Sequence, residues 1–306
     1  MQPPLRVVYV ASSSHSGSTL LALLADEHPG VASVGETAIK PKIRREGRAA
    51  SQHCSCGAPL QQCELWGRVF QQVSNEGIRF NANCWSNDYR FENKWLDAML
   101  TRETSLTILR RVRRATLRHL PRSAQRMARI DRANVSFIKA VLAQTGATVF
   151  VDTTKLLTRL SYLLEIPDLD VKIVHLVRDV RGFAASGKRR GVSVERAARV
   201  WRNDQRAIQA MVAAVPGERT LMMRYEDLCT QPRDTLARLW ALCGVGPAEP
   251  PAFVRSSDHH VIGNSMRMGG SIEVRLDETW RAVLDDREER RVLEIAGPLH
   301  QRLGYV

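Results

Sequence analysis

The feature that most constrains this chain is an apolar run that leads directly into a loop of small polar residues. Residues 5–11 (LRVVYVA) have the β-branched and apolar composition of a buried strand. Residues 12–19 (SSSHSGST) follow at once, and residues 20–25 form an apolar segment typical of a helix. A strand that turns through such a loop into a helix points backbone N–H groups and the helix N-terminus at one place. The opening of the chain therefore predicts a phosphate-binding site at the end of a strand.

The same succession of strand and helix recurs later in the chain. Residues 147–154 and 171–179 are apolar runs, and each is followed by a segment of helical character. Residues 220–225 are a fourth candidate strand, which follows a long helix expected over residues 193–215. Strands that alternate with helices pair in parallel, and the helices cover both faces of the sheet. We therefore expect an α/β protein with a P-loop-like, three-layer fold around a central parallel sheet.

Residues 40–144 have a different character, because they contain no comparable strand run. We expect them to be a mainly helical insertion within a single domain that spans residues 1–306. Within this insertion, residues 102–132 carry ten arginines, and their apolar positions suit a pair of amphipathic helices broken near Pro121. This basic stretch is either a solvated helix face or a surface for an anionic acceptor, a polyanion or a membrane.

The composition limits the class of protein further. Of the 306 residues, 44% are hydrophobic and 25% are charged, which excludes a disordered, collagen-like or disulfide-scaffold chain. The formal net charge of +13 indicates an anionic partner. No apolar run reaches the ~20 residues that a membrane-spanning helix requires, and the first residues lack the pattern of a signal peptide. These observations predict a cytoplasmic protein.

The polar loop differs from the phosphate loop of nucleoside triphosphatases, GxxxxGK[ST]. With Gly17 at the second glycine, Ser12 stands at the first and Ser18 stands where the lysine should be. The loop thus gives little support to a nucleoside triphosphate bound with magnesium.

A second anion site is indicated at Arg178, which stands at a strand end, and Ser186, which lies on the next helix. The two side chains could bind the same phosphate. The two sites together suggest a ligand with two separate phosphate groups.

Five segments, in this order, resemble the sulfotransferases that use 3′-phosphoadenosine 5′-phosphosulfate (PAPS). They are residues 14–20 (SHSGSTL), 34–36 (VGE), 151–155 (VDTTK), 175–186 (HLVRDVRGFAAS) and 224–228 (RYEDL). Residues 263–267 (GNSMR) and 280–281 (WR) are similar to the closing segment of this family. The chain looks most like the bacterial members and the branch that sulfates carbohydrates and tyrosyl residues of proteins. The resemblance spans nearly the whole chain and implies a PAPS-dependent sulfotransferase.

The resemblance implies a set of residues that bind the donor nucleotide. Arg178 and Ser186 would hold the 3′-phosphate. Tyr225 would lie near the adenine, and Arg267 would belong to a segment that closes over the nucleotide. The loop that would hold the 5′-phosphosulfate consists of Ser14, His15, Ser16, Gly17, Ser18 and Thr19.

The resemblance also implies catalytic roles for three residues. Glu36 matches a glutamate that takes the proton from the acceptor hydroxyl, and Lys155 matches a lysine that stabilises the sulfuryl group during transfer. His15 stands where many relatives have arginine or lysine beside the bridging oxygen of the leaving phosphate. A protonated His15 would donate to that oxygen, a neutral one could act as the base, and a purely structural one would bond the loop backbone.

These expectations combine into one leading function and two alternatives. The leading function is transfer of a sulfuryl group from PAPS to a hydroxyl, with no metal and no nucleic-acid partner. The acceptor would be a small molecule, glycan, lipid or peptide, and residues 40–144 would shape its site. The first alternative is a phosphoryl-transfer enzyme with a degenerate loop, in which Asp152 imitates a magnesium-binding aspartate. The second is a non-catalytic module that binds a polyanion.

Three cysteines, Cys54, Cys56 and Cys63, lie close together in the sequence. Their spacing is reminiscent of a metal knuckle, with Cys84 or His53 as a fourth ligand, but it is not a standard zinc pattern. A disulfide and reduced cysteines packed in the core are the two other interpretations. The sequence leaves all three open.

Overall fold

The computed structural model describes most of the chain. The described ranges are residues 3–37, 53–89, 107–249, 253–255, 259–261, 263, 265–268 and 271–306. Residues 40–52 and 90–106 of the expected insertion therefore lie outside the described residues, as does Asn264 of the expected closing segment.

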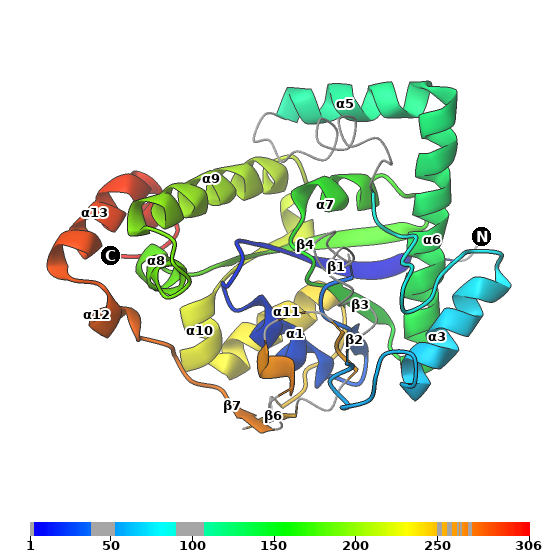
Figure 1. Ribbon diagram of the computed structural model, residues 1–306, viewed down its shortest axis with the longest axis horizontal. Coiled ribbons are helices and arrows are strands. Elements are labelled where there is room, and N and C mark those ends of the chain that lie inside the picture. Colours follow the sequence, from blue (N-terminus) through cyan, green and yellow to red (C-terminus); the bar gives the residue numbers. More distant parts are fainter. Residues whose placement is uncertain are drawn as a thin grey trace.

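A five-stranded parallel sheet forms the centre of the structure (Figure 1). Its strands lie in the order β2-β3-β1-β4-β5. The central strand β1 pairs along its whole length with β4, from Leu5 opposite Leu169 to Ser12 opposite Leu176. The strand bounds are β1 Leu5–Ser12, β2 Val31–Ser33, β3 Val149–Asp152, β4 Leu169–Val177 and β5 Thr220–Arg224. A small antiparallel pair, β6 and β7, comprises Phe253–Arg255 and Ser271–Glu273.

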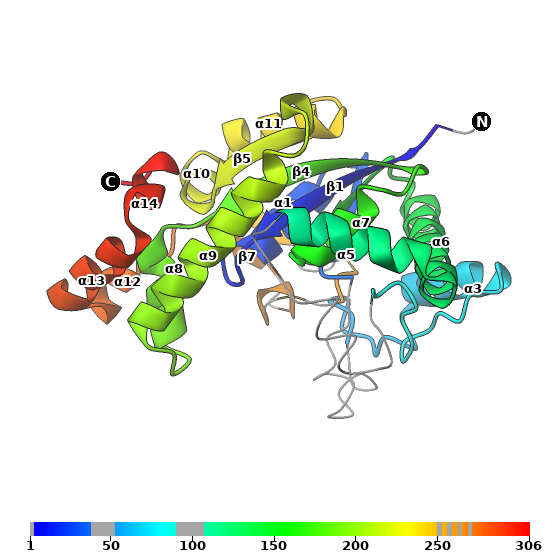
Figure 2. The same cartoon turned by 90° about the horizontal axis from the view of Figure 1, so that it is seen from above.

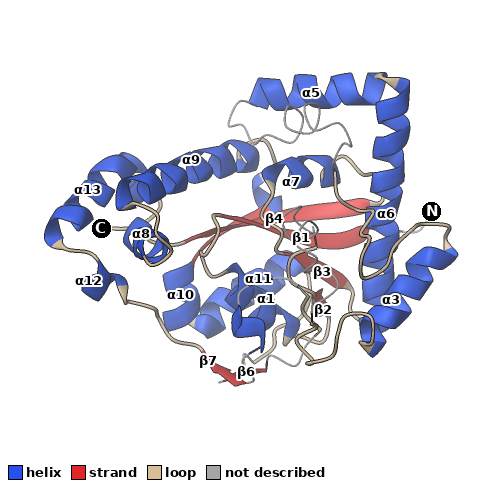
Figure 3. Cartoon of the chain, in the orientation of Figure 1, coloured by secondary structure: helices blue, strands red, loops and turns tan. Residues whose placement is uncertain are grey.

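The sheet lies between two layers of helices (Figure 3), and the side chains of the central strand β1 alternate between the two cores. Val7 and Tyr9 belong to the core shared with α6, α7 and α9, whereas Val8 and Val10 belong to the core shared with α1, α10 and α11. Both layers exclude water from the sheet, as the continuous apolar strands require. The helix bounds are α1 Ser18–Asp26, α6 Pro121–Thr145, α7 Leu157–Leu163, α9 Val194–Val212, α10 Tyr225–Thr230 and α11 Pro232–Cys243.

Three helices occupy the described part of residues 40–144: α3 (Glu64–Asn75), α5 (Thr107–His119) and α6. The helices α5 and α6 meet at a corner, and the expected break near Pro121 is confirmed (Figure 1). Proline is favoured at the first position of a helix because its missing N–H group would have no partner there. None of the helices that the structure describes, these three included, is long and apolar enough to cross a lipid bilayer.

The four expected strands are all present, which confirms the central parallel sheet. The fifth strand, β2, was not expected from the sequence. It has three residues and pairs only with β3, at the edge of the sheet. A run of that length carries too few positions for a periodic pattern, so its strand character depends on the neighbour that it pairs with.

The C-terminal helices are attached to the sheet through the residue that caps α8 (Val180–Lys188). The carboxylate of Asp179 accepts a 2.7 Å hydrogen bond from the backbone N–H of Arg181 and pairs with the Arg181 guanidinium at 2.6 Å and with His300 at 3.3 Å. Burial alone would raise the pKa of Asp179, but the hydrogen bonds from His300 and Arg181 lower it to about 2. Figure 2 shows these helices gathered at the end opposite the N-terminus; they are α12 Trp280–Val283, α13 Asp286–Ala296 and α14 Pro298–Arg302.

We expect Asp179→Asn to lower the free energy of unfolding by about 2 kcal/mol at pH 7, the value that corresponds to the depressed pKa. Because the folded-state pKa lies below the ordinary value of 3.8, this stabilisation is complete above about pH 4 and is lost as the pH falls through about 2. Urea denaturation of both proteins over this pH range measures the difference. Asp286→Asn, at an exposed position on α13, is the control. Equal differences at pH 3 and pH 7 would contradict the assignment.

Candidate functional site

A cavity of about 1220 Å³ lies at the carboxyl ends of the parallel strands. The chain moves to one side of β1 for β2 and β3 and to the other side for β4 and β5, so the loops that follow the strands diverge there. Ligands of open α/β sheets bind in the crevice that this reversal of strand order creates. The predicted site residues that line the cavity are Ser14, His15, Gly17, Ser18, Thr19, Glu36, Lys155, Arg178, Ser186 and Tyr225.

The polar loop after β1 takes a conformation that depends on Gly17. This residue has φ of 87°, in the left-handed region, and a Cβ atom placed there would lie 2.4 Å from the ring of Tyr225. Glycine is therefore required both by the backbone and by the close approach of the ring. His15 also has a positive φ, 64°, which is uncommon for a residue with a side chain and is typical of functional sites.

The N-terminus of α1 is open toward the cavity. Its N-cap residue, Gly17, has no side chain to cap it, and its first turn contains no acidic residue. The first N–H groups of a helix have no partners inside the helix, and the helix dipole places partial positive charge there. Ser18 and Thr19, which begin the helix, line the cavity. This arrangement suits an anion such as a phosphate or phosphosulfate group.

Glu36 and Lys155 form an ion pair beside this helix end. The Lys155 ammonium lies 2.6 Å from the Glu36 carboxylate and 3.1 Å from the hydroxyl oxygen of Ser18. Both charged side chains are largely buried, with 11% of each exposed. Lys155 follows β3 and has a positive φ of 70°, and Glu36 follows β2. The sheet thus brings together a carboxylate, an ammonium and the N-terminus of α1 from three separate strand ends.

Asp152, also at the end of β3, belongs to a buried network behind the cavity. Its carboxylate accepts hydrogen bonds from the Thr154 backbone at 2.9 Å and from the hydroxyl of Thr37 at 3.1 Å, and it pairs with Arg159 at 3.0 Å. Asp152 is fully buried and does not line the cavity. Because its carboxylate is bonded to these protein groups and lies away from the cavity, Asp152 is poorly placed to bind magnesium there.

A second cationic region of the cavity surrounds Arg178. Its guanidinium is 2.9 Å from the carboxylate of Asp277, donates to the carbonyl of His15 at 3.1 Å and lies over the Tyr225 ring at 4.6 Å. Burial would raise the pKa of Asp277, but hydrogen bonds from Thr279 and Arg178 lower it to about 2. Asp277 is therefore a carboxylate at neutral pH and balances the charge of Arg178.

Arg189 and Arg190 extend this cationic region and were not identified from the sequence. Both line the cavity, and Arg190 donates a 2.7 Å hydrogen bond to the hydroxyl of Ser186. Burial and the charges of Arg189 and Arg178 lower the pKa of Arg190. The sequence did offer a signal, the basic run of residues 188–190 (KRR), which begins two residues after Ser186. Nothing in the sequence around Asp277 indicated a role, because that role depends on its ion pair with Arg178, which is distant along the chain.

Two predicted site residues do not line the cavity. Ser16 is fully buried, and its hydroxyl has no hydrogen-bond partner among the described residues. Arg267 donates hydrogen bonds to the backbone carbonyls of His53 and His260, at 2.9 and 3.0 Å. Its neighbours Gly263 and Met266 line the cavity instead.

Comparisons with known proteins agree with this geometry. Residues 8–249 match the model of a family described as the sulfotransferase family. Mouse (Mus musculus) carbohydrate sulfotransferase 5 is 28% identical over 172 residues, which cover 47% of this chain and 44% of that protein. The matched region thus spans less than half the length of this curated relative.

Solved structures show the same fold. The sulfotransferase domain of the Synechococcus PCC 7002 olefin synthase has a TM-score of 0.56 at 18% identity, covering 100% of this chain and 97% of that one. A sulfotransferase domain from the curacin biosynthetic pathway has a TM-score of 0.51 at 17% identity, covering 100% and 99%. At this level of identity the likeness concerns the fold alone.

Proposed function

We propose that this chain, which belongs to the sulfotransferase family, transfers a sulfuryl group from PAPS to the hydroxyl group of an acceptor. The observation that carries the proposal is one cavity lined by two groups of residues suited to anions, the N-terminus of α1 with Lys155 and the cluster of Arg178, Arg189 and Arg190. PAPS carries a 5′-phosphosulfate and a 3′-phosphate, so it has one anionic group for each. ATP has its phosphates in one chain and would leave the second group of residues without a partner.

The donor would be held by its two phosphates and by its base. The 5′-phosphosulfate would bind at the loop from Ser14 to Thr19, with N–H groups of the loop and helix as donors. The 3′-phosphate would bind at Arg178 and Ser186, where Arg190 supplies a further charge. Tyr225 lies beside Gly17 and under Arg178, which supports a position near the adenine.

The transfer itself requires a base and stabilisation of growing negative charge. Glu36 would accept the proton of the acceptor hydroxyl, and Lys155 would move its hydrogen bonds toward the sulfuryl and phosphate oxygens as charge develops. The 3.1 Å contact between Lys155 and Ser18 supports this role, because it already brings the ammonium to the helix end. His15 would donate to the leaving phosphate. The acceptor site would be shaped by residues 40–144.

The transfer would need no metal. Phosphoryl and sulfuryl transfer require positioning and charge stabilisation, and cationic side chains with helix N–H groups can supply both. We expect adenosine 3′,5′-bisphosphate to bind roughly tenfold or more tightly than ATP with Mg²⁺, since ATP lacks the charged contacts of the 3′-phosphate. Isothermal titration measures both affinities.

The rate of transfer from PAPS to acceptors, measured by mass spectrometry, should also be the same with and without added Mg²⁺. Tighter binding of ATP, or a requirement for Mg²⁺, would overturn the proposal.

Arg178→Ala should weaken the binding of adenosine 3′,5′-bisphosphate far more than the binding of AMP, because AMP has no 3′-phosphate. Losing one charged hydrogen-bonding partner commonly costs about 1.5–3 kcal/mol, or roughly ten- to hundredfold in affinity. Titration of both nucleotides into each protein measures the selective loss. Arg122→Ala removes the same charge from an exposed position on α6 and should leave both affinities nearly unchanged. Equal losses for both nucleotides would assign Arg178 to another part of the ligand.

Glu36→Gln should slow the chemical step by about 10²–10⁴-fold, because the amide keeps the shape of the carboxylate and removes the base. Nucleotide affinity should remain nearly intact, since the loop and Arg178 are untouched. Single-turnover rates with PAPS and nucleotide titrations provide the two measurements. Glu76→Gln, the same change at an exposed position after α3, is the control. An unchanged single-turnover rate would remove Glu36 as the base and assign that role to His15 or to the acceptor's own surroundings.

A further inference from the structure

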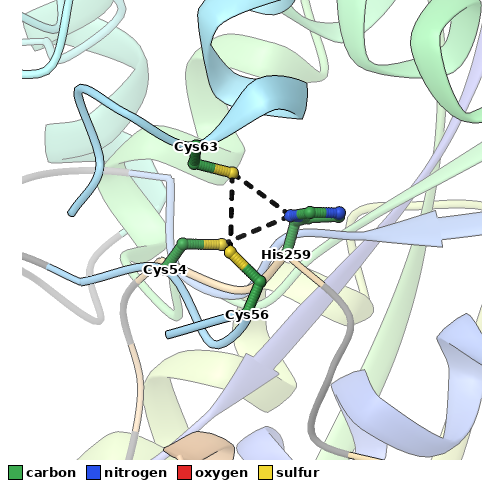
Figure 4. Close-up of side chains that lie close together, drawn as sticks. All are labelled: Cys54, Cys56, Cys63 and His259. Atoms are coloured by element: carbon green, nitrogen blue, oxygen red, sulfur yellow. Dashed lines mark hydrogen bonds between the residues drawn. The ribbon is translucent and has the colours of Figure 1, made fainter. Parts of the chain in front are cut away.

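Three thiols and one imidazole meet outside the nucleotide cavity. The ligating atoms of Cys54, Cys56, Cys63 and His259 all lie within 4.8 Å of one another (Figure 4). Cys54 and Cys56 belong to the segment before α3, Cys63 directly precedes that helix, and His259 comes from the C-terminal part of the chain. His259 thus takes the fourth position, for which the sequence had suggested Cys84 or His53.

The separations between these atoms match a tetrahedral zinc site. Four ligands around Zn²⁺ at Zn–S of about 2.3 Å and Zn–N of about 2.0 Å place sulfurs about 3.8 Å apart and sulfur and nitrogen about 3.5 Å apart. The sulfurs of Cys56 and Cys63 are 3.8 Å apart. The Nδ1 atom of His259 is 3.2 Å from the sulfur of Cys63 and 3.5 Å from that of Cys54. Each of these three separations is close to an edge of such a tetrahedron.

The surroundings of the cluster are also those of a metal site. Cys54 and Cys63 are buried, whereas Cys56 is exposed and leaves a route for an ion to enter. His259 is half-buried, and its Nδ1 atom faces the sulfurs of Cys54 and Cys63. Arg267 donates to the carbonyl of His53, next to Cys54, so a positive charge lies beside ligands that become thiolates.

The two other interpretations of the cysteines account for less. A disulfide requires sulfurs about 2.05 Å apart, and it would leave one thiol and the imidazole unexplained. All six cysteines of the chain are free in the structure. Thiols packed only as small apolar groups would not explain why the imidazole nitrogen points at two of them.

We propose that Cys54, Cys56, Cys63 and His259 bind one zinc ion in a closed, four-coordinate structural site. Its thiolate-rich ligand set and its lack of a fifth protein ligand among the described residues are typical of sites that stabilise folded structure. None of the four ligands lines the nucleotide cavity, so the ion takes no part in the transfer. The proposal does not depend on the identity of the donor.

The site joins the segment around His259 to the body of the protein. The carbonyl of His259 accepts a 3.0 Å hydrogen bond from the Trp66 indole. The backbone N–H of His260 donates to the Ser55 hydroxyl at 2.9 Å, and the His260 carbonyl accepts from the Ser55 N–H at 3.0 Å. Val261 donates to the carbonyl of Val34, two residues before Glu36, at 3.1 Å. Gly263, two residues further on, lines the nucleotide cavity. The zinc ion therefore holds the chain that leads into one wall of the cavity.

Metal analysis of the full chain, purified under reducing conditions without a metal-binding tag, tests the proposal. We expect about one zinc ion per chain in the unaltered protein and roughly a tenfold lower content in Cys63→Ser and His259→Ala. Cys84→Ser is the matched control, because Cys84 lies outside the cluster, and it should retain the zinc. Equal zinc content in Cys63→Ser and the unaltered protein would overturn the proposal. So would an intact mass, measured without reductant, that reveals a disulfide among the three cysteines.

Cobalt titration provides a test that does not depend on whether the variants fold. Unaltered protein stripped of metal with a chelator should bind Co²⁺ until about one equivalent is taken up, with the intense bands of tetrahedral thiolate coordination. Added Zn²⁺ should then displace the cobalt and abolish the bands. The absence of these bands, or bands of octahedral coordination by oxygen, would overturn the proposal.

Discussion

The contact between Gly17 and Tyr225 is the constraint on which the cavity at the carboxyl ends of the strands depends. The ring lies where a Cβ atom on Gly17 would be 2.4 Å away, so the loop after β1 and the start of α10 can approach only because residue 17 has no side chain. Arg178 lies over the Tyr225 ring, 4.6 Å from the ring centre, and donates to the carbonyl of His15. One close approach thus fixes the loop, the ring and the arginine relative to one another.

Two of the cations that line the cavity are each balanced by a carboxylate. Lys155 pairs with Glu36, and Arg178 pairs with Asp277. Such pairs keep charged side chains together at low exposure, where an unpaired charge would be costly. An anionic ligand would compete with Glu36 and Asp277 for these cations. Freed from Lys155, the carboxylate of Glu36 would be available to a hydroxyl proton, which links donor binding to the proposed base.

Prediction from the sequence succeeded where the signal is local and failed where it is not. The strand, loop and helix at the start of the chain are local, because β-branched runs, small polar residues and apolar periodicity each lie within a few positions. β2 and Asp277 were missed, since a three-residue strand is defined by its pairing with β3 and the acidic residue by its contact with Arg178, 99 positions away. His259 was missed for the same reason, at 196 residues from Cys63.

The sequence by itself determined the α/β class, the polar loop after the first strand and the family, because apolar runs, helical periodicity and short ordered motifs are properties of neighbouring residues. Only the tertiary structure decided which charges meet. The parallel sheet brings the ends of β1, β2 and β3 together, so Ser18, Glu36 and Lys155 come within hydrogen-bonding distance although 119 residues separate the last two. Such contacts depend on strand order and on where the chain returns, and no spacing along the sequence encodes either.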